Sequence, residues 1–310
     1  MAATGRKRFS GLRRRWEDSG YREGSLRLLA LVLLSVPIAV GYVWLVISTF
    51  ADRTFGLVPV DSRGRFGGLT LQNWEFLWRD AAVWVATLNT LVLSLGMTLV
   101  VVVVSALSGY ALSRLKFSGR KGFLAATLVL HAFPTVTLLI PTFLVLRWLS
   151  RLPVVGNDLP LVGGIGYNTI GGVILVSVAF QLPLGVWLMK GFFDNVPWDM
   201  ERAALIDGCT RFGAWWRVVL PQIRPGIAAL AIFSFITTWG SFIIPYTFIA
   251  SEQNNVLSVY LNSLLGTTAP VDYGKVAAVG LFQTIPVLVF FVFTQKYLLN
   301  IFASGAKGGA

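Results

Sequence analysis

Long uncharged runs alternate with short charged clusters along this chain of 310 residues. Six runs contain no Asp, Glu, Lys or Arg, and each holds about 20 residues or more, enough to cross a hydrocarbon core of roughly 30 Å as a helix. This pattern predicts an all-α membrane protein with six transmembrane helices. The predicted helices lie near residues 28–50, 84–110, 122–146, 169–190, 227–249 and 277–297.

The composition supports this class. Hydrophobic residues make up 55% of the chain and charged residues only 13%, with a mean hydropathy of +0.70. Soluble domains carry about 25% charged residues, so the deficit excludes an ordinary soluble fold. The single cysteine, Cys209, excludes an intrachain disulfide framework and is expected to be a small packing residue.

Lysine and arginine sort to one side of the predicted membrane. The terminal segments and the loops near 111–121 and 190–224 hold 19 of the 26 Lys and Arg residues. The positive-inside rule therefore places both termini and the loop between the fourth and fifth spans in the cytosol. We divide the chain into a basic cytosolic segment 1–27, a six-helix membrane domain 28–299 and a cytosolic tail 300–310. The basic head is interpreted as a membrane anchor and not as a nucleic-acid-binding arm.

The predicted spans lack charged side chains. Ion-coupled carriers and pumps usually place ionisable groups at membrane depth, so this absence argues against that class. His131 is expected to pack or line a pore and not to relay protons. No H-E-x-x-H, G-x-S-x-G or P-loop pattern occurs. We therefore expect no catalytic residue, no metal site and no ATP site in this chain, and the energy for any active transport would enter through another polypeptide.

Neutral polar residues do occur within the spans. Hydroxyl and amide groups often simply join helices, at about 0.6 kcal/mol for each hydrogen bond. Together they also suit a path for a neutral, hydroxyl-rich solute, and an aromatic face on the fifth span suits the apolar face of a sugar. Ordinary packing is the alternative. The residues expected to line such a path are Asn89, Thr237, Thr238, Trp239 and Ser241.

The segment 191–226 is polar and has a helical pattern of its own. Pro197 suits the first turn of a helix, Gly208 is a typical C-terminal glycine, and Thr210 can cap a second helix. The second helix carries an apolar face at positions i, i+3, i+4 and i+7, made by Phe212, Trp215, Trp216 and Val219. The segment is therefore either a docking surface for a cytosolic partner or an interfacial hairpin without one.

Motifs in this loop carry a family resemblance. Glu201-x-Ala203-Ala204-x-x-Asp207-Gly208, followed by Pro221 and Pro225, resembles the E-A-A…D-G…P…P loop of ABC importer permeases. The loop is therefore expected to hold the coupling helix of that family. Two positions depart from the family pattern. Arg202 replaces the first alanine of the triplet, and Gly240 follows Trp239 where asparagine is usual.

Segments outside the loop extend the resemblance to residues 28–309. Residues 109–120, Gly-Tyr-Ala-Leu-Ser-Arg-Leu-Lys-Phe-Ser-Gly-Arg, are similar to G-Y-A-L-A-R-x-x-F-x-G-R of the carbohydrate-uptake branch. Residues 89–91, 133–134 and 305–308 also fit that branch. The combination most resembles the second permease of such pairs, the maltose-transporter MalG type.

The resemblance implies an alternating-access permease in a bacterial or archaeal cell membrane. Two permease subunits form the pathway, two cytosolic ATPase subunits bind ATP and Mg, and an extracytoplasmic binding protein delivers the solute. The docking residues that it implies are Glu201, Ala203, Ala204, Asp207, Gly208, Pro221 and Pro225. The implied contacts for the binding protein are Glu252, Gln253, Asn254 and Asn255.

Other functions remain open at this point. The preferred solute is an oligosaccharide or monosaccharide, with glycerol phosphate as a rival. An importer permease for an amino acid, peptide or polyamine is disfavoured by the 109–120 segment. A self-contained carrier or channel would work without an ATPase and predicts charge within the membrane. A membrane enzyme would need catalytic groups that the sequence does not show.

Overall fold

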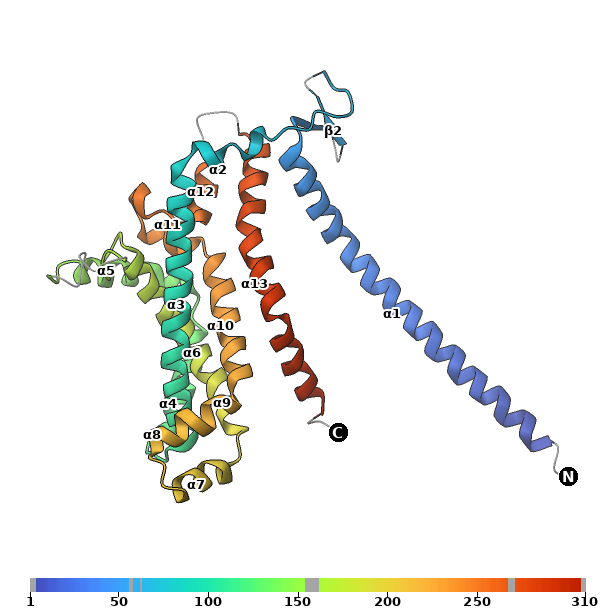
Figure 1. Cartoon of the computed structure of the whole chain (residues 1–310), viewed down its shortest axis with the longest axis vertical. Helices are drawn as coiled ribbons and strands as arrows, with labels where there is room; N and C mark the ends of the chain where they lie inside the picture. The colour runs from blue at the N-terminus through green and yellow to red at the C-terminus, as the bar shows by residue number, and fades with distance from the viewer. Residues whose placement is uncertain (1–3, 56–57, 62, 154–161, 267–270, 308–310) are drawn as a thin grey trace. The chain divides into compact units, whose positions relative to one another are not determined.

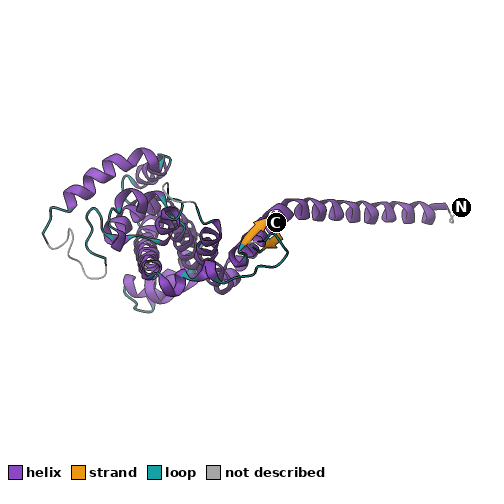
Figure 2. Ribbon diagram, turned by 90° about the horizontal axis from the view of Figure 1, so that it is seen from above, coloured by secondary structure: helices purple, strands orange, loops and turns teal. Residues whose placement is uncertain are grey.

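The computed structural model describes residues 4–55, 58–61, 63–153, 162–266 and 271–307. Helices make up most of this part of the chain (Figure 2). The α-helices are α1 Thr4–Phe50, α2 Phe76–Arg79, α3 Ala81–Arg114, α4 Arg120–His131, α5 Leu139–Leu149, α6 Ile170–Asp194, α7 Trp198–Ile206, α8 Arg211–Ala214, α9 Leu220–Gln222, α10 Arg224–Trp239, α11 Ile243–Phe248, α12 Leu257–Ser263 and α13 Tyr273–Lys307. The remaining elements are the 3₁₀ helices η1 Gln72–Trp74, η2 Thr135–Leu138 and η4 Glu252–Asn254, the π-helix η3 Trp215–Val219, and the strands β1 Arg53–Phe55 and β2 Val58–Val60.

The chain divides into two units, the first formed by residues 1–74 and 273–281. In this unit α1 leads into an antiparallel hairpin of β1 and β2. The amide of Asn73 donates to the carbonyls of Thr49 at 3.2 Å and Ala51 at 3.0 Å, which ties η1 to the end of α1. α1 passes residue 27 without a break, so the expected boundary between the basic segment and the first span is not a change in secondary structure.

The second unit, residues 75–272 and 282–310, is built on α3. This helix packs along α6 and α10 (Figure 1). Small residues allow the close approach: a Cβ added at Gly109 would lie 2.8 Å from the backbone nitrogen of Lys190, and one at Gly185 would lie 2.4 Å from Ser105 Oγ. Buried apolar side chains from the three helices then fill the core, among them Met97, Val101, Met189 and Leu230.

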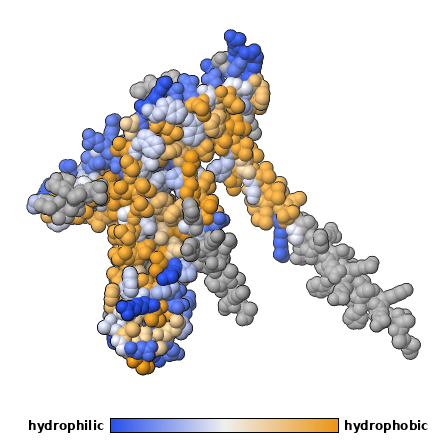
Figure 3. All heavy atoms as spheres, in the orientation of Figure 1, coloured by the Kyte–Doolittle hydropathy of each residue, from blue (hydrophilic) through white to orange (hydrophobic). Residues whose placement is uncertain are grey.

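Four helical segments are long and apolar enough to cross a membrane: Arg27–Phe50, Ala81–Arg114, Ile170–Asp194 and Tyr273–Val292. They correspond to the first, second, fourth and sixth predicted spans. Two bent helix pairs raise the number of candidate spans to six if each pair is one span. Within unit two, apolar residues cover the sides of the helices, and hydrophilic residues gather at the α7–α8 end and around α2 (Figure 3).

The two other spans are not the continuous helices that the sequence predicts. In place of a helix over 122–146, α4 and the segment Thr135–Leu149, made of η2 and α5, meet at 95°. Pro134 separates them, because proline donates no backbone hydrogen bond and disfavours a helical residue before it. In place of a helix over 227–249, α10 ends at Trp239 with Gly240 as its C-cap, and α11 follows.

Candidate functional site

The loop between α6 and α10 folds into short helices joined by a glycine turn, as predicted. Pro197 lies at the N-cap of α7, one position before the first turn in which it was expected. Gly208 follows α7 with a left-handed φ of 86°, a conformation that favours glycine. The N–H of Cys209 donates to the Ala204 carbonyl at 3.0 Å and that of Gly208 to the Leu205 carbonyl at 3.1 Å. This Schellman arrangement fixes the direction in which the chain leaves α7.

The second half of the loop starts at Thr210, whose side-chain oxygen accepts from the Gly213 N–H at 3.1 Å, as predicted for a cap. The π-helix η3 follows α8 and changes the helical period. The expected single apolar face is therefore divided. Trp215 is 8% exposed and Val219 is fully buried, whereas Phe212 and Trp216 are 68% and 58% exposed. Only half of the face belongs to the core.

Two predicted docking residues, Pro221 and Pro225, lie where the loop leads into α10. Pro221 lies in the first turn of α9 and Pro225 in the first turn of α10. Pro225 costs no helical hydrogen bond there, because the first N–H groups of a helix have no partner within it, whereas α9 continues from η3 without a break, so that Pro221 lies near the end of the helical run Arg211–Gln222. These prolines therefore shape the corner between the loop and α10, where the two helical segments meet at 73°.

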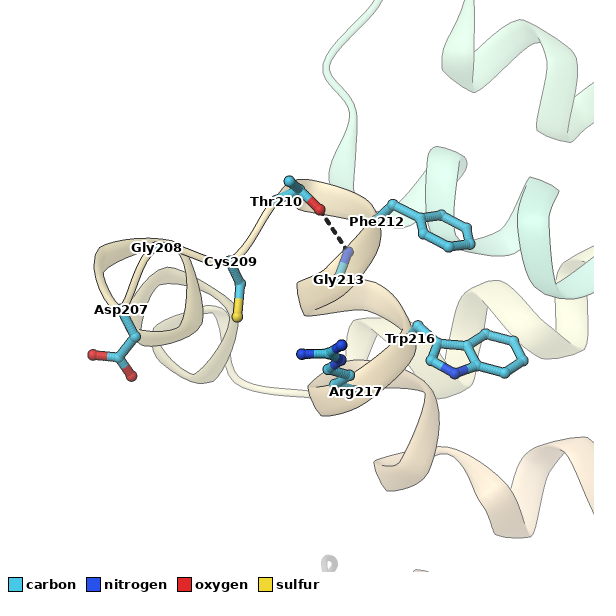
Figure 4. Close-up of a pocket in the computed structure, with 8 residues that line it drawn as sticks. All are labelled: Asp207, Gly208, Cys209, Thr210, Phe212, Gly213, Trp216 and Arg217. Atoms are coloured by element: carbon cyan, nitrogen blue, oxygen red, sulfur yellow. Dashed lines mark hydrogen bonds between the residues drawn. The ribbon is translucent and has the colours of Figure 1, made fainter.

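The tip of the loop is exposed and partly apolar. Ile206 is 85% exposed, and Ala203, Asp207 and Gly208 are exposed beside it. A hollow of about 450 Å³ adjoins the tip and is lined by Asp207, Gly208, Cys209, Thr210, Phe212, Gly213, Trp216 and Arg217. Figure 4 shows the Asp207 carboxylate turned outward, while the guanidinium of Arg217 points toward Cys209. An approaching protein would meet the small side chain of Ala203, an isoleucine and a carboxylate.

Two other predicted docking residues, Glu201 and Ala204, are each only 6% exposed. The carboxylate of Glu201 accepts a hydrogen bond of 2.5 Å from the Tyr110 hydroxyl and lies 3.1 Å from Arg114 Nε. Both partners belong to the last turns of α3. Tyr110 and Arg114 were noted in the sequence only as part of the 109–120 resemblance, without individual roles, although their spacing of four residues places them on one helix face.

At the opposite end of α3, a loop of unit two is fixed by side-chain amides. The Asn89 amide donates to the backbone carbonyls of Gln253 and Asn255, both at 2.9 Å. Asn254 donates to the Asn168 carbonyl at 2.6 Å. Of the four residues expected to contact a binding protein, Glu252 and Gln253 are exposed, and Asn254 and Asn255 are half-buried. Asn89, expected in the pathway, is thus a partner of this loop.

The candidate pathway residues of the fifth span have different environments. Thr238 and Trp239 are buried, and the Trp239 Nε1–H donates to the Gln283 carbonyl at 2.9 Å. Thr237 is exposed, and its hydroxyl donates to the Phe233 carbonyl of the same helix. The carbonyl of Ser241 accepts from the Ser258 hydroxyl at 2.7 Å. Thr237 is therefore the residue of this group that presents an open surface.

His, Cys, Asp and Glu are the side chains most suited to holding a metal ion. Within the part of the chain that the structure describes, no three of these side chains gather closely enough to hold a metal ion. The two features that distinguish α7 are an exposed turn on one side and a buried ion pair on the other.

Comparisons with known proteins all identify transport permeases. Residues 102–299 match the family described as binding-protein-dependent transport system inner membrane component. The trehalose transport system permease protein SugB of Mycobacterium tuberculosis is 28% identical over 78% of this chain and 83% of its own length. The trehalose/maltose transport system permease protein MalG of Thermococcus litoralis is 26% identical over 92% of this chain and 96% of its own.

A solved structure has the same fold. One chain of a bacterial ABC transporter involved in the import of the acidic polysaccharide alginate superimposes with a TM-score of 0.72. The alignment covers 90% of this chain and 97% of that chain, at 19% identity. At this identity the likeness establishes the fold alone.

Proposed function

Because the chain belongs to the family of binding-protein-dependent transport system inner membrane components, we propose that it is one permease subunit of an ABC importer for a carbohydrate. It is an integral inner membrane protein, and in this proposal a second permease completes the translocation pathway. Two cytosolic ATPase subunits bind ATP and Mg and hydrolyse the ATP. An extracytoplasmic binding protein delivers the solute.

The observation that carries the proposal is the exposed turn after α7. Ile206 is 85% exposed although it is apolar, and the Schellman turn holds it in a defined position beside Asp207. Contiguous exposed apolar residues are typical of a contact with another protein, and the exposed Phe212 and Trp216 line the hollow that adjoins this turn. The exposed members of the proposed ATPase contact are Ala203, Asp207 and Gly208, together with Ile206.

The proposed orientation follows from charge. The α7–α8 loop and the 111–121 loop lie on the Lys- and Arg-rich side, which the positive-inside rule assigns to the cytosol together with both termini. The exposed Glu252 and Gln253 then face the extracytoplasmic side, where the binding protein docks. Asn254 and Asn255 support this contact from their half-buried positions.

The proposed solute class rests on similar proteins whose names specify sugars. They include permeases named for trehalose, for trehalose and maltose, and for diacetylchitobiose, the last from Streptomyces coelicolor. An oligosaccharide or monosaccharide suits a bundle whose candidate pathway residues are neutral hydroxyl, amide and aromatic groups. Thr237 is the residue we place nearest to the solute.

The test is affinity purification of the tagged chain from its native membrane. The wild type should retain a stoichiometric ATPase and a second permease, and Asp207→Arg combined with Gly208→Trp should lose the ATPase. Glu252→Arg is the matched control, because it reverses an exposed acid at the opposite end of the bundle and should retain the ATPase. A lone wild-type chain that moves solute in reconstituted vesicles without ATP would overturn the proposal.

A further inference from the structure

Arg114 and Glu201 form an ion pair that is almost completely buried, with side-chain exposures of 2% and 8%. Glu201 belongs to the first turn of α7, and Arg114 is the last residue of α3. Tyr110 completes the cluster by donating its hydroxyl proton to the second carboxylate oxygen of Glu201 at 2.5 Å. Three side chains thus join the loop helix to one membrane-spanning helix.

Arg114 holds the entry of the loop as well as the helix. Its Nη2 donates to the Val196 carbonyl at 2.8 Å, just before α7 begins. Its guanidinium lies 4.6 Å from the ring centroid of Trp198, the first residue of α7. One cation therefore contacts the chain before α7, the start of α7 and the carboxylate within its first turn.

The Tyr110 ring extends the cluster into the core. It makes an edge contact with Phe193 of α6 at 5.6 Å between centroids and a tilted contact with Trp215 of η3 at 6.2 Å. The end of α3 is therefore packed against both halves of the loop. A force on α7 would reach α3 through charge, hydrogen bond and ring contact together.

Stability alone does not account for buried charges here. Arg114 Nε and Glu201 Oε2 have each other as their ionic partner, and neither makes a hydrogen bond of good geometry. Apolar residues of similar volume often stabilise a core as well as a buried ion pair does, so such a pair is more consistent with a demand for one defined position.

We propose that Tyr110, Arg114 and Glu201 are positioning residues that fix α7 to the end of α3, so that movement of the docking loop moves this span. The inference rests on the proposed function and deepens it. It gives Glu201 an internal role, while the exposed face of α7 contacts the partner. It also assigns Tyr110 and Arg114 of the Gly-Tyr-Ala-Leu-Ser-Arg segment to the connection between the loop and α3.

The test measures solute imported per ATP hydrolysed by the purified full complex in proteoliposomes. Tyr110→Phe removes the hydroxyl and keeps the ring. Arg114→Met combined with Glu201→Gln removes both charges at similar volume. Each variant should retain the ATPase and hydrolyse ATP, while the ratio falls by roughly fivefold or more, the range of a typical coupling between sites. Ser113→Ala is the matched control, because Ser113 bonds Asp194 of α6 at 2.6 Å from the same turn of α3, and its ratio should not change.

Three results would overturn the inference. A wild-type ratio in the double variant or in Tyr110→Phe would mean that the cluster is packing only. Loss of the ATPase in Glu201→Gln, but not in Tyr110→Phe or Arg114→Met, would mean that Glu201 contacts the partner directly. A wild-type chain that retains no ATPase would remove the proposed function itself, and this inference with it. If the double variant fails to assemble, Tyr110→Phe decides the question, because it leaves both charges in place.

Discussion

The two ends of α3 are fixed by different chemistry. At one end, a buried cation and a buried carboxylate connect Arg114 of α3 to Glu201 of α7. At the other end, the neutral groups of Asn89 and Thr90 bond backbone atoms of residues 253–257. Both ends carry loops that the proposed function brings into contact with other proteins.

This difference predicts different mechanical behaviour. Breaking a buried ion pair leaves a charge in a poorly solvated environment. We therefore expect α7 and the end of α3 to move as one rigid body. Neutral hydrogen bonds can be exchanged for water one at a time at a net loss of about 1 kcal/mol each. We therefore expect the Asn89 end to adjust when a solute-binding protein docks and the Arg114 end to transmit motion without adjusting.

The largest effect should come from removing one charge of the pair. Arg114→Met leaves the Glu201 carboxylate buried without its cation and should lower the free energy of unfolding by about 3–5 kcal/mol. The double variant with Glu201→Gln should lose markedly less. Denaturant unfolding of the purified complex in detergent measures both. Arg202→Met is the control, because its 3.6 Å pair with Asp199 is exposed; a loss there as large as at Arg114 would contradict the comparison.

Two neighbouring tryptophans of η3, Trp215 and Trp216, differ in burial and should differ in their contribution to stability. Trp215→Ala empties part of the core and should cost about 3–5 kcal/mol of unfolding free energy. Trp216→Ala removes an exposed ring and should cost about 0.5 kcal/mol or less. The same unfolding measurement tests both variants. Equal losses would contradict the division of the apolar face into a buried part with Trp215 and an exposed part with Trp216.

At the opposite end, Asn89→Ala leaves the carbonyls of Gln253 and Asn255 without their donor. We expect a loss of about 1–3 kcal/mol, concentrated in residues 250–257 and visible as faster amide hydrogen exchange there. Gln253→Ala is the control, because the bond uses only its backbone carbonyl. Unchanged exchange in Asn89→Ala would contradict the assignment of this amide to the loop.

The smallest effect should be a pH dependence at the same end. Burial and the hydrogen bond that Tyr260 donates to Asp80 at 2.6 Å raise the pKa of Tyr260 above its usual 10.0. The folded state thus favours the protonated phenol, and its stabilising contribution is complete below pH about 10 and lost as the pH rises further. Unfolding measured across this range should show an alkaline loss that Tyr260→Phe diminishes. The same loss in Tyr260→Phe as in wild type would assign it to another group.

Sequence reasoning predicted the elements that hydrophobic run length determines. The segments at 28–50, 84–110 and 169–190 are helical because uninterrupted apolar helices satisfy their own backbone groups in a membrane. Run length does not show where a helix bends, so the breaks after His131 and Trp239 were missed. Pro134 and Gly240 were the local signals, and each is a known helix breaker.

The sequence predicts where the helices of the loop end and begin, but it does not predict which residues they contact. Gly208 and Thr210 mark a helix end and a helix start by their own chemistry, and the structure confirms both. The burial of Glu201 depends on Arg114, a residue far away in the sequence. The role of Asn89 depends on backbone carbonyls, which every residue carries and no sequence pattern distinguishes. Contacts of these two kinds required the folded arrangement.

A directed cross-link from the exposed turn after α7 would show whether this turn contacts the ATPase. Ile206→Cys, in a Cys209→Ser background that removes the single native cysteine, would carry a short photoactivatable cross-linker in the native membrane. We expect an adduct between this chain and the ATPase, and no such adduct from Glu252→Cys. An ATPase adduct from position 252, or none from position 206 in membranes that contain the assembled complex, would contradict it.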